Sequence, residues 1–229
     1  MRRYLVVLAA LVLAVVQSSS ALAQFGASVY ATSGSYTAVV SGTGSFVSNN
    51  GIGINTTGSG NIYFTTETGV AGFGDAVKFG FGSDSKVSTP GLHTSSIGGT
   101  AYITWKITGP TSSAPYDVVV TTSSYTYNEA SAFSHRSDSS AYGHGSGPVG
   151  SATQYASGTN DDPGPVPDPH TSLLYHTVTL GTDGIGYVTV PFIGQSESQA
   201  YNPNLTDNAT FGDGFFDFKV KVIDVEYAP

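Results

Sequence analysis

Four side chains that carry oxygen lie close together in one proline-rich stretch of the chain. Asn160, Asp161 and Asp162 are consecutive, and Asp168 follows them after three prolines. Carboxylate and amide oxygens are the ligands that hard cations such as calcium prefer. The spacing is not that of a helix-flanked calcium loop, and a solvated acidic turn is the alternative. We therefore name these four residues as a candidate calcium site.

A smaller acidic group follows near the C-terminus. It comprises Asp207, Asn208 and Asp213. Its oxygen atoms suit the same cations, and its alternative is again a solvated turn. If either group binds calcium, we expect millimolar calcium to raise the melting temperature of the protein.

Tyrosines are the candidate binding residues. Tyr125, Tyr127, Tyr142 and Tyr155 lie in or beside the least patterned part of the chain, where loops are expected. A tyrosine ring offers an apolar face for stacking on a sugar ring and a hydroxyl group for a hydrogen bond. Tyrosine is also common on ordinary β-surfaces, which is the alternative. We name these four as candidate saccharide contacts.

Residues capable of acid–base or nucleophilic chemistry form no recognisable set. A glycosidase needs two carboxylates about 5–9.5 Å apart, and nothing in the sequence pairs Glu67, Glu129 or Glu197. A zinc site needs converging ligands, and the spacings of the histidines match no zinc motif. The chain contains no cysteine, which excludes thiol catalysis and disulfides. We expect no enzymatic activity and no cofactor other than calcium.

The charge balance disfavours whole classes of partner. The sequence has 16 acidic and 8 basic residues, a formal net charge of −8. A surface of this sign repels nucleic-acid phosphates and anionic membranes, and no basic cluster interrupts it. The abundant hydroxyl groups favour a neutral, hydrogen-bonding partner such as a polysaccharide or another copy of the chain.

The first 23 residues have the features of a cleaved export signal. Arg2 and Arg3 precede the apolar run 5–16, and residues 21–23 form a small-residue cleavage signature. As a helix the apolar run is too short to cross a bilayer core of about 30 Å. We expect cleavage after Ala23, a secreted protein, and no membrane span in the mature chain.

The stretch 214–227 carries the clearest structural pattern. Phe216, Phe218, Val220 and Val222 alternate with polar residues, as the side chains of a half-buried β-strand do. After Val222 the apolar pattern shifts by one position. One extra residue there, a β-bulge, keeps a single buried face along the strand. We predict a long, bent strand that covers one side of a β-sandwich core.

Other stretches also predict strands. Residues 101–107 alternate and place Trp105, the only tryptophan, on the apolar side. Residues 173–180 and 185–192 predict a hairpin that is joined by a short glycine-containing turn. Pro191 has no amide donor, so the second arm should run along a sheet edge or contain a bulge at that point.

The composition predicts the fold class. The 29 glycines and abundant Ser and Thr are typical of short strands and many turns. The weakly patterned stretch 128–171 predicts a long variable loop region with one or two strands inside it and a stiff proline loop at its end. We predict an all-β protein in which a signal peptide, 1–23, precedes one antiparallel β-sandwich, 24–229, of jelly-roll type with about ten to twelve strands.

Two functions fit this description. The first is a secreted, non-catalytic structural protein of an extracellular matrix, filament or cell-surface layer. Its copies would associate by strand addition if the segment 24–41 left its own domain to complete the sheet of a neighbour; an ordinary first strand is the alternative. The second is a secreted module that binds carbohydrate, such as a polysaccharide, or another surface ligand.

Overall fold

The computed structural model describes residues 25–42, 58–67, 76–87, 90–148, 150–161, 164–203 and 210–229. The predicted signal peptide, 1–23, lies outside these residues, as do Asp162, Asp207 and Asn208. Every element in the described part of the chain is a β-strand. The same residues contain no helix that is long and apolar enough to cross a membrane. The predicted all-β fold is confirmed.

Ten strands make up the described structure. They are β1 (Gly26–Gly42), β2 (Gly58–Asn61), β3 (Thr65–Glu67), β4 (Ala76–Val87), β5 (Gly91–Thr108), β6 (Tyr116–Gly147), β7 (Gly150–Asp161), β8 (Val166–Leu180), β9 (Ile185–Asn202) and β10 (Thr210–Tyr227).

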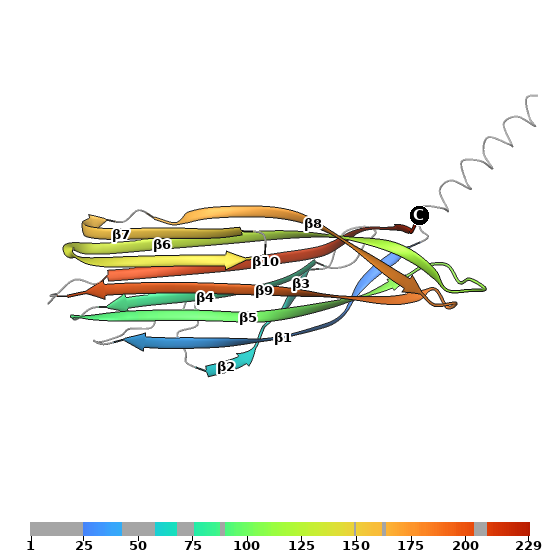
Figure 1. Cartoon of the computed structure of the whole chain (residues 1–229), viewed down its shortest axis with the longest axis horizontal. Helices are drawn as coiled ribbons and strands as arrows, with labels where there is room; N and C mark the ends of the chain where they lie inside the picture. The colour runs from blue at the N-terminus through green and yellow to red at the C-terminus, as the bar shows by residue number, and fades with distance from the viewer. Residues whose placement is uncertain are drawn as a thin grey trace, which may run out of the picture.

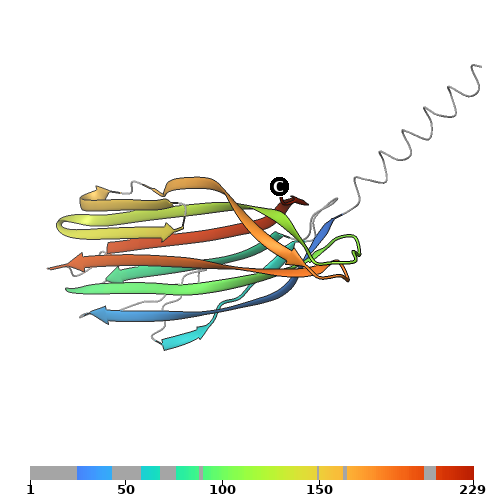
Figure 2. The same ribbon diagram turned by 45° about the vertical axis from the view of Figure 1, so that its right-hand side comes forward.

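The strands form two antiparallel sheets that pack as a sandwich (Figures 1 and 2). Sheet A has the order β2-β1-β5-β9-β6-β7, and sheet B has the order β8-β6-β10-β4-β3. β6 belongs to both sheets, because it pairs with β10 in sheet B as far as Phe133 and with β9 in sheet A from Ser140 onward. This order defines an antiparallel sandwich, and the more specific expectation of a jelly roll stays a prediction.

One half of the sandwich contains a core of large side chains. Trp105 from sheet A and Phe81, Phe216 and Phe218 from sheet B are all buried there. The rings of Phe192 and Phe218 bring the two sheets into contact, with centroids 4.5 Å apart. Burial of a large apolar side chain of this kind contributes about 1.5–3 kcal/mol. The predicted burial of Trp105 is confirmed.

The other half of the sandwich is closed by small residues. Gly143 and Gly145 of β6 face Gly212 and Gly214 of β10 across the two sheets. A Cβ atom on Gly143 would lie 1.9 Å from the carbonyl oxygen of Asp213. Stacked sheets ordinarily lie about 10 Å apart, and here glycine allows the two backbones to approach each other directly.

Serine hydroxyl groups connect the sheets in this half. The Oγ atoms of Ser83 in β4 and Ser196 in β9 are 2.8 Å apart. Ser198 Oγ donates to Ser85 Oγ at 3.0 Å, and Ser196 Oγ donates to the carbonyl of Gly214 at 2.5 Å. Because these hydroxyl groups find partners across the interface, they remain buried without a large desolvation penalty.

The bulge predicted in the last strand is confirmed. The pairing of β10 with β6 shifts register between Val222 and Asp224, which makes Ile223 the extra residue. Val220, Val222 and Val225 are buried on one face, while Ile223 is exposed. The bulge therefore restores the buried face at Val225.

The predicted hairpin is wrong. β8 pairs with β6 in sheet B, whereas β9 pairs with β5 and β6 in sheet A. The turn between them is as expected, because the amide of Gly184 donates to the carbonyl of Gly181 at 2.9 Å. A tight turn fixes the reversal of the chain, but the partner of each strand depends on residues far away in sequence.

Pro191 does lie on a local edge, as predicted, since no described strand pairs with β9 there on the side away from β5.

The prediction that 128–171 is mainly loop is also wrong, whereas the strands expected inside it are present. β6 continues to Gly147, β7 follows, and β8 begins at Val166. The strand pattern is hidden because the inward positions of β6 in this region carry small or polar residues rather than large apolar ones. Ala130, Ala132 and Gly143 are buried where the two backbones approach closely.

Because the two backbones approach so closely, a methyl group added at one of these glycines should lower the stability of the protein. Gly143→Ala should destabilise the protein by about 3 kcal/mol, near the upper end of overpacking effects, because the new methyl group meets backbone that cannot move aside. Gly98→Ala is the matched control, since its Cβ would lie no closer than 3.6 Å to another atom. This control should stay within about 0.5 kcal/mol of the parent chain. Urea unfolding measures both, and equal midpoints for the two variants would contradict the close-packed interface.

Candidate functional site

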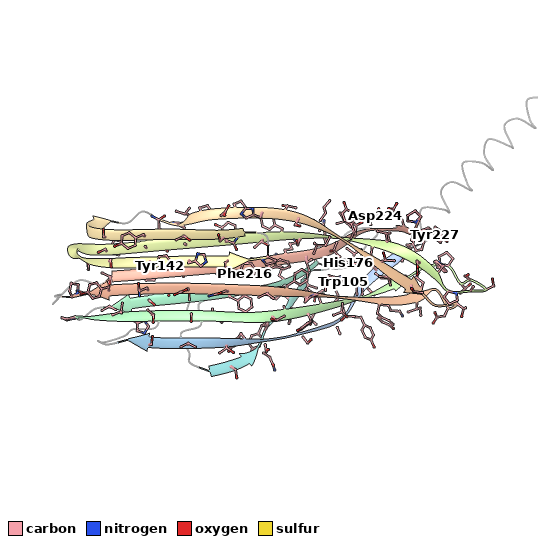
Figure 3. The ribbon with its side chains drawn as sticks, viewed as in Figure 1. Trp105, Tyr142, His176, Phe216, Asp224 and Tyr227 are labelled. Atoms are coloured by element: carbon pink, nitrogen blue, oxygen red, sulfur yellow. The ribbon has the colours of Figure 1, made fainter. Side chains whose placement is uncertain are left out.

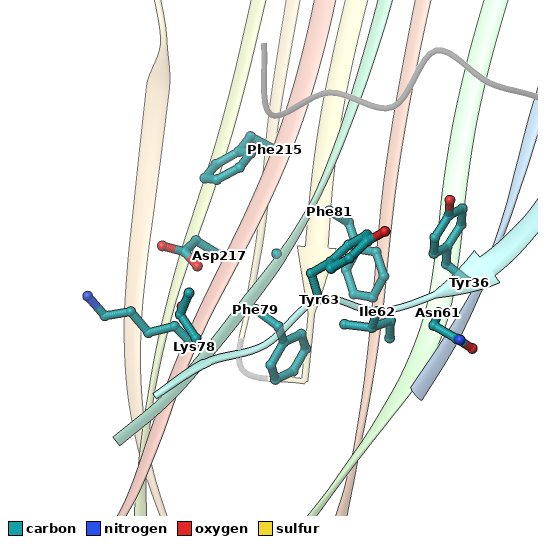
Figure 4. A pocket seen from close by; sticks show the side chains of 11 residues that line it. Tyr36, Asn61, Ile62, Tyr63, Lys78, Phe79, Phe81, Phe215 and Asp217 are labelled. Atoms are coloured by element: carbon teal, nitrogen blue, oxygen red, sulfur yellow. The ribbon is translucent and has the colours of Figure 1, made fainter. Parts of the chain in front are cut away.

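A groove of about 550 Å³ opens beside β4, on the side where no described strand pairs with it beyond Lys78 (Figure 4). The segment that joins β2 to β3 forms one side, and the outer face of β10 forms the other. Ligand sites in proteins typically enclose about 300–1,000 Å³. The lining residues are Tyr36, Asn61, Ile62, Tyr63, Thr65, Lys78, Phe79, Gly80, Phe81, Phe215 and Asp217.

Local packing places Tyr63 at the mouth of the groove. Ile62 is buried, and its amide donates to the carbonyl of Gly34 at 3.0 Å. Phe64 packs on Phe79 with ring centroids 5.5 Å apart. Because both of its neighbours are anchored inward, Tyr63 points outward, and 88% of it is exposed.

Tyr36 of β1 forms part of the wall on the β2 side. A Cβ atom on Gly60 would lie 2.7 Å from the Tyr36 hydroxyl oxygen, so the ring rests directly on the backbone of β2. Phe79 and Phe81 supply the apolar floor, and Phe215 adds a further ring (Figure 4). The groove thus presents several aromatic rings, all on strands except Tyr63, which lies in the anchored segment between β2 and β3.

Two opposite charges lie on the rim. Burial raises the pKa of Asp217, while its hydrogen bond from the Phe218 amide, at 2.8 Å, and the nearby Lys78 ammonium group lower it. Among the described residues that line the groove, only Lys78 and Asp217 are charged. The rim is therefore close to neutral overall.

A pair of carboxyl groups lies on the outer face of sheet B. Asp84 of β4 is directly opposite Asp213 of β10, and the two side chains share a hydrogen bond. Burial, the charge of Asp84 and the charge of Glu129 raise the pKa of Asp213 to about 7. Two adjacent carboxyl groups cannot both ionise cheaply, so the pair retains a proton near neutral pH.

Glu129 is held by a neighbour on the same strand. The Tyr127 hydroxyl donates to Glu129 Oε2 at 2.5 Å. This hydrogen bond is the largest cause, and burial the second, that raises the pKa of Tyr127 to about 12.

Among the residues that the structure describes, no three His, Asp or Glu side chains converge to hold a metal ion.

The four tyrosines named from the sequence lie on two opposite faces. Tyr125 and Tyr127 both lie on the outer face of sheet B, on either side of the buried Thr126. Tyr142 and Tyr155 are cross-strand neighbours of β6 and β7 in sheet A. The structure therefore joins them in two pairs rather than in one site, and each pair lies on strands instead of the expected loops.

Within the candidate calcium site, Asp168 lies apart from Asp161. Asp161 pairs with Ser134, whereas Asp168 pairs with Asn128, six residues away along β6. At about 3.3 Å per residue this separation is about 20 Å. Asp168 Oδ1 instead lies 2.9 Å from Nε2 of His170. The side chains of residues 160–162 lie outside the description, so calcium binding there stays a prediction.

Sequence reasoning missed the residues that form the groove and the carboxyl pair. Tyr36 and Tyr63 lie in stretches with weak strand patterns, and neither has a spacing that links it to the other. Asp84 and Asp213 are far apart in sequence and meet only through the pairing of β4 with β10. The alternation of apolar and polar residues in 214–227 did place Asp217 on the outer face of its strand.

The comparisons with known proteins add no relative. No family model matches the chain, and no curated protein matches it in sequence.

The carboxyl pair predicts a pH dependence of stability. A carboxyl group whose pKa is higher in the folded state than its ordinary value of 3.8 favours folding when protonated. Its stabilising proton is fully present below about pH 4 and is lost as the pH rises toward 7.

Asp213→Asn should remove this loss, so the variant should melt at a higher temperature than the parent chain at about pH 8 and at a similar temperature at about pH 4. Glu226→Gln, at an exposed position of the same strand, is the control. Melting curves across this pH range measure the effect. An Asp213→Asn variant with the same pH profile as the parent chain would rule out the shared proton.

Proposed function

We propose that the protein is an exported, non-catalytic structural subunit of an extracellular matrix, filament or surface layer, and that its copies are joined by exchange of β1. The leader-like segment 1–23, the lack of cysteine and the Gly/Ser/Thr-rich β composition support export and a structural role. The way in which β1 is attached to the rest of the sandwich carries the proposal.

β1 is held mainly through its backbone. It pairs with β5 over its whole length, from Gly26 opposite Thr108 to Gly42 opposite His93. On its other side β2 pairs only with residues 35–38, and no other described strand covers that edge. Main-chain hydrogen bonds of this kind form equally well with the same strand of another copy.

The side chains of β1 contribute little to the core. Ala38 is its only fully buried apolar residue. Ala27, Val29 and Tyr36 are half-buried against the core. The central strand β10 buries Phe216, Phe218, Val220 and Val222 by contrast. Because the free energy of burial scales with apolar area, the release of β1 costs less than the release of β10 would, and β5 then offers a free edge.

An exchanged β1 would make with the neighbouring copy the same contacts that it makes in its own domain. In the structure β1 lies in its own sheet, and the β1 strand of a neighbour would occupy the same register on β5. Exchange from each copy to the next leaves both ends open and therefore builds a filament, whereas reciprocal exchange closes a dimer. This is the strand addition that the segment 24–41 suggested from the sequence.

A second candidate function is the binding of carbohydrate or another surface ligand. The groove beside β4 supports it, because aromatic rings and a neutral polar rim are the usual features of such sites. The two functions are compatible, since a matrix subunit benefits from holding the polymer that surrounds it.

A cysteine pair tests the exchange of β1, since the native chain has no cysteine. Ser41 of β1 and Thr94 of β5 are directly opposite each other, with hydroxyl oxygens 2.6 Å apart. In a chain with both Ser41→Cys and Thr94→Cys, oxidation should link neighbouring copies if β1 is exchanged. Non-reducing gels of assembled material should then show a ladder of trimers and larger species.

The single variants Ser41→Cys and Thr94→Cys are the controls, because one cysteine per chain can link no more than two copies. Reduction should return every band to the monomer. A double variant that oxidises only to an internally bridged monomer, in material prepared at high concentration, would show that β1 stays in its own domain and would contradict the proposal.

A further inference from the structure

The groove beside β4 has the chemistry of a saccharide site. Its walls carry ring faces from Tyr36, Tyr63 and Phe215, and its floor is formed by Phe79 and Phe81. The C–H face of a pyranose ring stacks on such aromatic surfaces, while its hydroxyl groups require partners at the rim. The described residues provide both kinds of contact in one place.

The polar partners lie at the edges of the groove. The Asn61 amide can both donate and accept, the tyrosine hydroxyl groups do the same, and the Asp217 carboxylate accepts. Lys78 lies beside Asp217 and offsets its charge. A strongly charged ligand would therefore find no net attraction, whereas an uncharged, hydroxyl-rich ligand would find several hydrogen-bond partners.

We infer that this groove binds a segment of a neutral polysaccharide, with Tyr63 as the stacking platform at its mouth. The groove, with a volume of about 550 Å³, opens at the surface rather than forming an enclosed cavity, so a saccharide segment can enter it. The walls are preformed, because Ile62 and Phe64 anchor the segment that carries Tyr63. A preformed site loses little conformational entropy on binding.

A peptide strand is the competing occupant. The edge of β4 beyond Lys78 pairs with no described strand on the side away from β10, and an extended peptide could add to it. The aromatic rings on both sides of the groove and the hydroxyl and amide groups at its rim favour the saccharide. Strand addition would use the β4 backbone and would depend little on the exposed ring of Tyr63.

Exposed tyrosines allow a matched comparison. Tyr63 is 88% exposed at the groove, and Tyr175 is 68% exposed on β8, far from the lining residues. Neither supports the core, so both alanine variants should fold. Side chains project outward along the whole sandwich (Figure 3), and a sugar could contact them away from the groove. A control at a second exposed tyrosine is therefore necessary.

The experiment is a calorimetric titration of the monomeric mature chain with cellohexaose, xylohexaose and chitohexaose. We expect the parent chain and Tyr175→Ala to bind at least one of the three with equal affinity. Tyr63→Ala should bind it about tenfold more weakly, as the loss of one aromatic stacking contact predicts.

Absence of binding to all three oligosaccharides would overturn the inference, and so would equal affinities for Tyr63→Ala and Tyr175→Ala. A peptide that matches residues 24–42 is titrated in parallel. Binding of this peptide without binding of any sugar would overturn the saccharide inference in favour of strand addition. The inference rests on the second candidate function, and its failure in monomers would leave the disulfide-ladder test of β1 exchange unaffected.

Discussion

The direct approach of two backbones is the constraint on which the rest of the structure depends. Over one half of the sandwich, Gly143 and Gly145 lie against the backbone of β10, and Gly212 and Gly214 lie against that of β6 and β9. Most of the large buried side chains lie in the other half for this reason. Phe216 lies at the boundary, where Gly147 and Gly194 leave room for its ring.

β6 determines which strand edges remain open. Its first part belongs to sheet B and its last part to sheet A, so the covalent chain ties the sheets together at one end. Its pairing with β9 ends at Ser146 opposite Gln195, which leaves the preceding part of β9 paired with β5 alone. β1 then completes sheet A on the far side of β5, through backbone hydrogen bonds and little burial.

β10 links the core to both surface features. Its inward residues fill the core, while its outward residues Asp213, Phe215 and Asp217 reach the carboxyl pair and the groove. β1 contributes Tyr36 to the same groove. In an assembly joined by exchanged β1 strands, each groove would therefore take Tyr36 from a neighbouring copy, which would couple the proposed assembly to the proposed saccharide site.

The sequence by itself determined the all-β class, the buried face of 101–107 with Trp105, and the last strand with its bulge, because alternation of large apolar side chains is a local property of the chain. It did not determine the strands within 128–171, since glycine and alanine at inward positions carry no hydropathy signal. Only the tertiary structure decided that β8 and β9 enter different sheets, that Asp84 meets Asp213, and that Tyr36 and Tyr63 line one groove. These features depend on which distant strands become neighbours, and that choice is made by packing between the sheets rather than by any local pattern.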